Sequence, residues 1–125
     1  MSVFISYAMD DKPRIKKVIE ELKTERIIEE NDKIVDTSDI FVPGSNVRTQ
    51  VRKAIEEASK VVVVWSGAGA QSDWVNYETG MAEALAKPIL VVVPKGKRSR
   101  LPSNLSKGSQ IIESDSWELS GTFRE

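Results

Sequence analysis

The chain has 125 residues, of which 40% are hydrophobic and 30% charged, and its formal net charge is −1. These values are ordinary for one globular domain, and they give no global reason to expect nucleic acid binding. The absence of cysteine and histidine excludes thiol nucleophiles, Ser/His triads, disulfides and the usual zinc sites. Any catalysis must therefore use carboxylates, hydroxyls, amides, Arg or Lys.

The sequence leads us to expect no targeting signal. No apolar run is long enough to span a bilayer, and the N-terminus leads into strand-like sequence without a basic-then-apolar signal segment. We therefore expect an intracellular, cytoplasmic protein. Residues 1–125 are expected to form a single domain, either alone or as the N-terminal part of a longer protein.

The first half of the chain alternates strand and helix patterns. A β-branched and aromatic run predicts a buried strand at Val3–Tyr7, and apolar residues at helical spacing predict a helix with Asp11 as its N-cap. A second strand is predicted at Ile34–Asp36. A polar loop, residues 37–44, separates it from a second helix that begins near Ser45.

The second half continues the alternation. The unbroken apolar run Val61–Trp65 predicts a strand buried on both faces, at the centre of the sheet. A helix over residues 72–86 leads to another buried strand, Pro88–Val93, and Gln110–Glu113 predicts a short edge strand. This order predicts parallel strands that are joined by right-handed crossovers and covered by helices on both faces.

The helix over residues 72–86 carries a carboxylate at an unusual place. Trp74, Met81, Ala82 and Leu85 form one apolar stripe, and Glu78 lies in its middle. Burying an ionised carboxylate without a partner costs several kcal/mol. The helix pattern therefore leaves two interpretations, a structural pair with a nearby Lys or Arg, or a carboxylate held to meet developing positive charge.

The expected ligand site follows from the sheet. Ligands of open parallel sheets bind outside the carboxyl ends of the strands. That rule selects the segments Tyr7–Asp10, Thr37–Phe41 and Ser66–Gly69, together with the first turns of the Glu78 helix. Their aromatic rings and hydroxyls, with one carboxylate on an apolar wall, suit a nucleoside-like ligand. The predicted ligand contacts are Tyr7, Ala8, Ser38, Asp39, Phe41, Ser66, Gly67 and Trp74.

Four segments carry a family resemblance. They are the opening Val3–Ala8, the Pro43-Gly44 loop, the Val61–Ser66 strand and the segment Ser72–Glu78, in that order. With them the chain resembles TIR (Toll/interleukin-1 receptor) domains over nearly its whole length. The resemblance implies a flavodoxin-like three-layer sandwich with about five parallel strands in the order 2-1-3-4-5.

The resemblance also implies a reaction. Trp74 and Glu78 match the WxxxE pattern of prokaryotic-type catalytic members, in which the glutamate is required to cleave the nicotinamide–ribose bond of NAD. It implies an NAD glycohydrolase or ADP-ribosyl cyclase in bacterial immune defence or signalling. NAD or NADP would be the substrate, with no metal and no separate cofactor. Self-association through the Asp39–Gly44 loop would activate the enzyme.

Two alternatives stay open. Residues 78–89 resemble the helix-to-strand segment of nucleoside 2-deoxyribosyltransferases, in which the glutamate attacks the sugar. A non-enzymatic TIR adaptor would use the same surfaces only to bind other TIR domains. Basic residues at Lys95, Lys97, Arg98 and Arg100 and the amides of Gly67 and Gly69 favour NAD, which brings two phosphates. The sequence leaves open whether water, an adenine nitrogen of the same molecule or another nucleophile completes the reaction.

Overall fold

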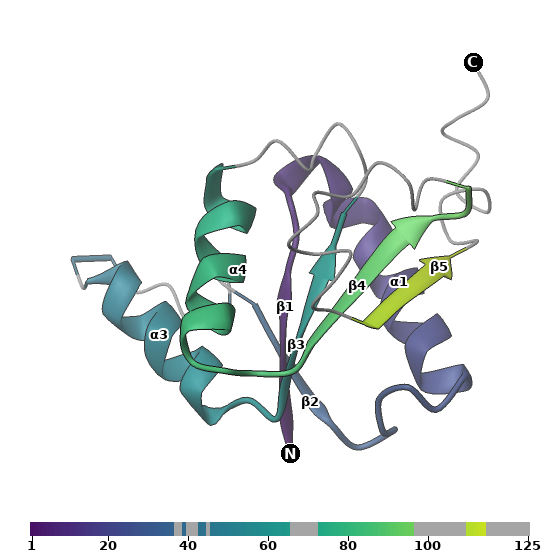
Figure 1. Ribbon diagram of the computed structural model, residues 1–125, viewed down its shortest axis with the longest axis horizontal. Coiled ribbons are helices and arrows are strands. Elements are labelled where there is room, and N and C mark those ends of the chain that lie inside the picture. The colour runs from purple at the N-terminus through teal and green to yellow at the C-terminus, as the bar shows by residue number, and fades with distance from the viewer. Residues whose placement is uncertain (37–38, 40–42, 45, 66–72, 97–109, 115–125) are drawn as a thin grey trace.

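The computed structural model describes residues 1–36, 39, 43–44, 46–65, 73–96 and 110–114. Within them, five parallel strands form one sheet in the order β2-β1-β3-β4-β5 (Figure 1). The strands are β1 (Ser2–Ser6), β2 (Lys33–Val35), β3 (Lys60–Val64), β4 (Ile89–Pro94) and β5 (Gln110–Ser114). The predicted fold class and strand order are confirmed.

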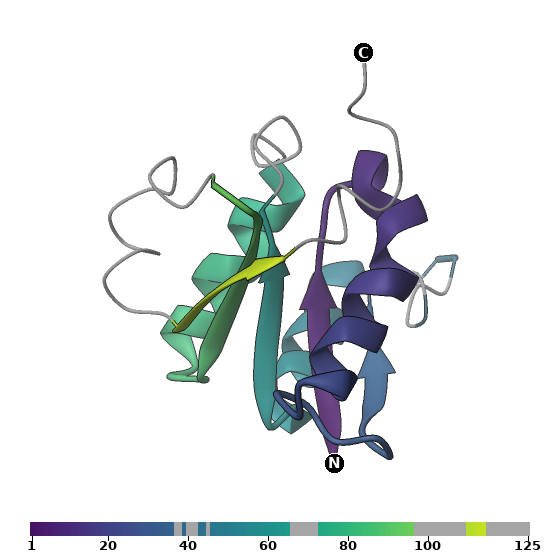
Figure 2. The ribbon, with the colours of Figure 1, turned by 90° about the vertical axis from the view of Figure 1, so that its right-hand side faces the viewer.

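Helices cover both faces of the sheet. A 3-10 turn, η1 (Met9–Asp11), leads into α1 (Lys12–Thr24), and two further helices are α3 (Val47–Glu57) and α4 (Asp73–Ala84). The views in Figures 1 and 2 show α1 on one face and α3 with α4 on the other. The three layers follow from βαβ crossovers, which place each helix on the sheet between two parallel strands.

The helices begin within two residues of the predicted positions, and α1 and α3 have N-caps of different kinds. Asp11 stands at the N-cap of α1 without a capping hydrogen bond from its side chain, and its carboxylate instead accepts a bond from Arg14 at 3.3 Å. The side chain of Asn46 caps α3 and accepts hydrogen bonds from the backbone amides of Arg48 and Thr49. Such a cap satisfies amides that the helix itself leaves without partners.

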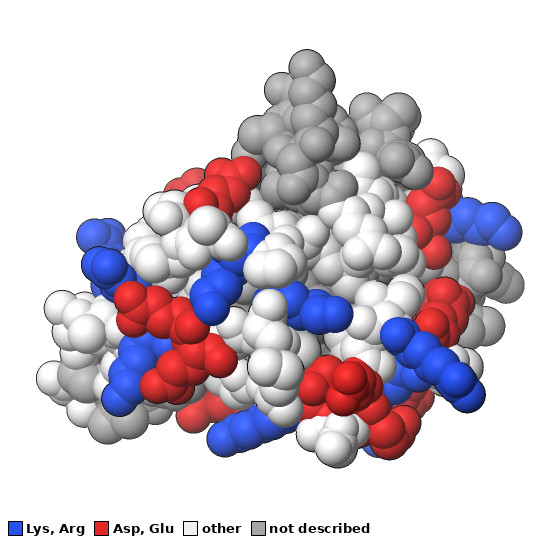
Figure 3. Space-filling model, turned by 60° about the horizontal axis from the view of Figure 1, so that its bottom comes forward, with Lys and Arg blue, Asp and Glu red and all other residues white. Residues whose placement is uncertain are grey.

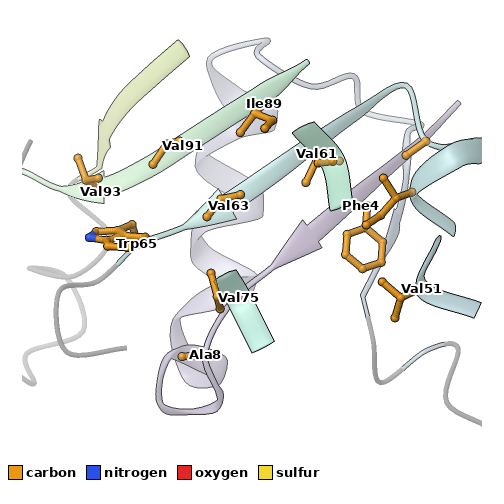
Figure 4. Packing of buried hydrophobic residues seen from close by; sticks show 13 residues of the cluster. Phe4, Ala8, Val51, Val61, Val63, Trp65, Val75, Ile89, Val91 and Val93 are labelled. Atoms are coloured by element: carbon orange, nitrogen blue, oxygen red, sulfur yellow. The ribbon is translucent and has the colours of Figure 1, made fainter. Parts of the chain in front are cut away.

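The core is divided by the sheet into two apolar clusters. Because successive strand residues point to opposite faces, Val61 and Val63 pack toward α3 and α4, whereas Val62 and Val64 pack toward α1. Figure 4 shows part of the first cluster, with Phe4 and the β3 and β4 valines on one side of the sheet. The unbroken apolar run of β3 therefore serves both clusters, as its position in the middle of the sheet requires.

Candidate active site

Glu78 lies in the second turn of α4, on the face that packs on the sheet. Only 1% of it is exposed, which confirms the prediction that this carboxylate is on the core face. The predicted stripe is confirmed in part: Ala82 is buried, whereas Trp74, Met81 and Leu85 pack against the same cluster but are only partly buried. The buried face of α4 consists of Val75, Glu78, Thr79 and Ala82.

Ser6 meets Glu78 inside this layer. It is the last residue of β1, it is 1% exposed, and its Oγ donates a hydrogen bond of 2.5 Å to Glu78 Oε1. Strand alternation places Ser6 on the same face as Phe4, toward α3 and α4. A carboxylate from α4 and a hydroxyl from β1, 72 residues apart in sequence, thus form one buried pair.

Apolar residues make up the cluster that the described part of the chain forms in this layer. Ala8 after β1, Val63 and Trp65 from the β3 segment, and Val75 from α4 belong to the cluster of this layer (Figure 4). Burial of this kind disfavours an ionised carboxylate, whereas a hydroxyl that donates to it stabilises the charge. In a medium of low dielectric constant the same carboxylate attracts a nearby positive charge more strongly than it would in water.

Tyr7 follows Ser6 but belongs to the other face. Its ring packs against the cluster on the α1 side, and its hydroxyl donates to Asp36 Oδ2 at 2.7 Å. The Asp39 amide donates to Asp36 Oδ1 at 3.2 Å, and the Asp36 amide donates to Asp39 Oδ2 at 2.9 Å. The end of β1 is therefore tied to the start of the 37–44 loop through Tyr7 and Asp36.

Trp74 lies at the start of α4 in a row of stacked groups. Its ring stacks on Tyr77 with 5.3 Å between the ring centroids and an interplanar angle of 27°. The guanidinium group of Arg48, from α3, lies over the Tyr77 ring, 5.6 Å from the ring centroid. Stacking and cation–π contacts together join the N-terminal parts of α3 and α4.

The predicted site residues are only partly brought together. Ala8 and Trp74 pack against the same apolar cluster, above which α4 carries Glu78, whereas Tyr7 faces α1 and Asp39 is exposed. Lys95 follows β4, and its amide donates to the Ser114 carbonyl. Ser38, Phe41, Ser66, Gly67, Gly69, Lys97, Arg98 and Arg100 lie outside the described residues.

Ser6 was missed by the sequence reasoning. The signal was present, since alternation along β1 gives Ser6 the same face as Phe4, and a polar side chain in a buried strand needs a partner. Nothing local identifies that partner, because Glu78 comes from a helix far along the chain.

Among the parts of the chain that the structure describes, no group of three or more His, Cys, Asp or Glu side chains could hold a metal ion, and no helix is long and apolar enough to cross a membrane. On the face in Figure 3, near the end where the strands begin, acidic and basic side chains are interspersed. That surface offers no field of a single sign to attract a charged ligand.

Comparisons with known proteins add a family and a fold. A family model described as TIR domain matches residues 3–121. No curated protein sequence matches the chain. The fold resembles a metazoan TIR-STING receptor from C. gigas with a TM-score of 0.66 and 22% identity, covering 98% of this chain and 40% of that one. The chain thus spans less than half the length of that receptor.

Two solved enzymes share the fold over nearly their full length. A CMP N-glycosidase from Clostridium botulinum has a TM-score of 0.59 and 19% identity, with 96% of this chain and 98% of that one covered. A 2-desoxiribosyltransferase from Leishmania mexicana has a TM-score of 0.54 and 15% identity, with 98% and 95% covered. At such identities these likenesses establish the fold alone.

Proposed function

Because this chain belongs to the TIR domain family, we propose that it cleaves the bond between nicotinamide and ribose in NAD, and that Glu78 is its catalytic carboxylate. The observation that carries the proposal is the burial of Glu78, which is 1% exposed on an apolar helix face. An adaptor that only binds other TIR domains has no physical need for this costly placement.

The two enzymes of the same fold support the type of chemistry. One is named an N-glycosidase and the other a desoxiribosyltransferase, and both names describe substitution at the sugar carbon of an N-glycosidic bond. The nicotinamide–ribose bond of NAD is a bond of this kind. The proposed reaction therefore belongs to the same class but has a different substrate.

The chemistry suits a chain without histidine. Nicotinamide in NAD is a cation, so when the bond from C1′ breaks, the electron pair leaves with the nicotinamide nitrogen and no general acid is needed. Positive charge then develops on the ribose as in an oxocarbenium ion. Glu78 would stabilise that charge electrostatically or attack C1′ covalently, and its dry surroundings strengthen either interaction.

The reaction is completed by a second electron pair. In hydrolysis, water adds to C1′ and releases a proton, which gives ADP-ribose. In cyclisation, a nitrogen of the adenine ring of the same molecule forms the new bond to the ribose carbon. The proposal includes both routes, because Glu78 acts on the step that they share.

Self-association is the second part of the proposal. The loop assigned to it contains Asp39, Pro43 and Gly44, which are exposed where the structure describes them. Asp39 also accepts a hydrogen bond from the Asp36 amide, and the Asp36 carboxylate accepts one from the hydroxyl of Tyr7 at the end of β1. A contact made at this loop would therefore act next to the strand that ends in Ser6.

A substrate comparison tests the proposal. The purified chain, at high protein concentration, is incubated with NAD, with NADP, and separately with deoxyinosine and deoxyadenosine, and the released bases are separated by chromatography. We expect free nicotinamide from NAD and NADP and no base from the deoxynucleosides. Base release from a deoxynucleoside with NAD left intact would assign the chain to the transferases, and turnover of neither class would support the adaptor.

A further inference from the structure

We propose that Ser6 is a positioning residue for Glu78, whose hydroxyl fixes the orientation of the carboxylate and keeps it ionised in the apolar layer. The catalytic consequence rests on the function proposed above. The coupling between the hydroxyl and the carboxylate does not, and it can be measured without any turnover.

The geometry of the pair carries the first step. Both residues are 1% exposed, and the distance from Ser6 Oγ to Glu78 Oε1 is 2.5 Å. Hydroxyl-to-carboxylate bonds in which the acceptor is ionised have lengths of about 2.5–2.7 Å and are about twice as strong as neutral ones. The contact joins two buried groups, so the Ser6 hydroxyl holds the Glu78 carboxyl oxygen in place.

The strand makes Ser6 a rigid anchor. Ser6 lies opposite Val63 in the parallel pairing of β1 with β3, so its backbone is held by the sheet. The serine side chain has one torsion that places its oxygen, whereas the glutamate side chain has three. The bond therefore restricts Glu78 far more than Ser6, which is the arrangement that pre-organises a reacting group.

Several charged side chains of α3 and α4 have contacts of their own or are exposed. On this face β1 and β3 present Phe4, Val61 and Val63, and α3 presents Val51 and Ile55. From α3, the guanidinium of Arg48 lies over Tyr77, and Arg52 pairs with Glu56 at 3.4 Å on the surface. Glu83, on α4 itself, is exposed. The Ser6 hydroxyl therefore supplies a polar contact where these facing side chains are apolar.

The chain contains a matched control on the opposite face. Ser114, the last residue of β5, is 1% exposed, and its Oγ donates to Oε1 of Glu21 on α1 at 2.5 Å. The bond is the same in type and length, but Glu21 has no place in the proposed reaction. Removing each serine in turn separates a general loss of stability from a specific effect on Glu78.

Kinetics of the Ser6 variants form the first test. We expect Ser6→Ala to lower kcat for NAD cleavage about 10- to 100-fold, the scale of one hydrogen bond to a charged group, with KM unchanged. Without the donor the carboxyl group keeps its proton to higher pH, so the acid side of the pH–activity profile should move to higher pH. Ser6→Thr, which keeps a hydroxyl, should restore most of the rate. Ser114→Ala should change neither kcat nor the pH–activity profile.

An NMR titration tests the coupling without turnover. Glutamate is labelled with ¹³C at the side-chain carboxyl, and the Glu78 signal is assigned by its loss in Glu78→Gln. Its titration midpoint should move to higher pH in Ser6→Ala and stay in place in Ser114→Ala. If Ser6→Ala does not fold, Ser6→Cys replaces it, because a thiol is a weak donor of similar size.

The outcomes separate the two proposals. A wild-type chain that releases no nicotinamide, together with a shifted Glu78 midpoint in the Ser6 variant, would refute the proposed function and retain the coupling. An unchanged midpoint in a folded Ser6→Ala or Ser6→Cys variant would overturn the positioning role. An unchanged pH profile in an active variant would overturn it equally.

Discussion

Two serine–glutamate pairs join the sheet to its helices, one on each face. Ser6 with Glu78 links β1 to α4, and Ser114 with Glu21 links β5 to α1, both at 2.5 Å and both through the last residue of a strand. They differ in burial, since Glu78 is 1% exposed and Glu21 is only partly buried. They also differ in position: the strand of Ser6, β1, lies next to the central strand, whereas the strand of Ser114, β5, is at the edge of the sheet.

The difference shows that a short hydrogen bond does not by itself indicate a site. A carboxylate with access to water keeps part of its hydration, so the bond from Ser114 to Glu21 serves well as a clip that holds an edge strand to a helix. A fully buried carboxylate loses that hydration, and evolution rarely places one in a core without a use. Burial therefore distinguishes the candidate site from its counterpart.

The largest expected effect comes from neutralising each glutamate. Glu78→Gln should fold normally and lose at least about 100-fold in NAD cleavage, because it removes the partner of the transition-state charge. Glu21→Gln, the matched change in the other pair, should keep wild-type turnover. Nicotinamide release measures the first quantity, and thermal unfolding by circular dichroism measures the fold. Wild-type turnover in a folded Glu78→Gln variant would contradict the assignment.

The second prediction concerns the dependence of activity on protein concentration. If self-association activates the chain, specific activity should rise with protein concentration. Gly44 has a φ of +85°, which proline cannot adopt. Gly44→Pro should therefore weaken assembly and lower activity together. The association constant should fall about 10-fold for each 1.4 kcal/mol of binding free energy that is lost. Light scattering and a dilution series of the activity follow the two effects. Constant specific activity across the series would exclude activation by assembly.

A smaller effect is expected from the edge clip. Ser114→Ala should lower the free energy of unfolding by about 1–2 kcal/mol, because it removes one hydrogen bond to a carboxylate and leaves that acceptor partly accessible to water. NAD cleavage per folded molecule should stay at the wild-type value. Urea unfolding measures the stability. A large loss of activity at unchanged stability would mean that the Glu21 pair, too, takes part in the reaction.

The smallest effect concerns the helix that carries Glu78. Gly80 is exposed in α4, and a Cβ added there would meet no atom within 4 Å. Gly80→Ala should therefore raise the free energy of unfolding by about 0.5–1 kcal/mol through helix propensity alone. The Ser6–Glu78 contact would be left in place, so turnover should be unchanged. A destabilised Gly80→Ala variant would show that the residue meets something beyond the described contacts.

Local patterns in the sequence carried much of the fold. The apolar run of β3, the strand–helix alternation and the helical spacing of the apolar residues each reflect short-range periodicity, and the structure agrees with all three. Glu78 was also found in this way, because its position on a helix face depends only on its neighbours along α4. The strand order came with the family resemblance and not from the periodicity.

The faces of individual residues were harder to predict. The α4 stripe included two large apolar residues, Trp74 and Met81, which pack against the core but are only partly buried. Tyr7 was predicted as a ligand contact, and this stays a prediction; its side chain, one residue further along the strand than Ser6, points to the opposite face of the sheet. Its hydroxyl accordingly meets Asp36 and not the Glu78 layer.

The sequence by itself determined the elements, their alternation and a carboxylate on an apolar helix face, because each of these depends on residues a few positions apart. Only the tertiary structure decided which hydroxyl meets that carboxylate. Ser6 and Glu78 are 72 residues apart, and no local preference of either segment encodes the other. They come into contact because the β1–β3 pairing and the packing of α4 on those strands bring the end of one strand beneath the second turn of a helix.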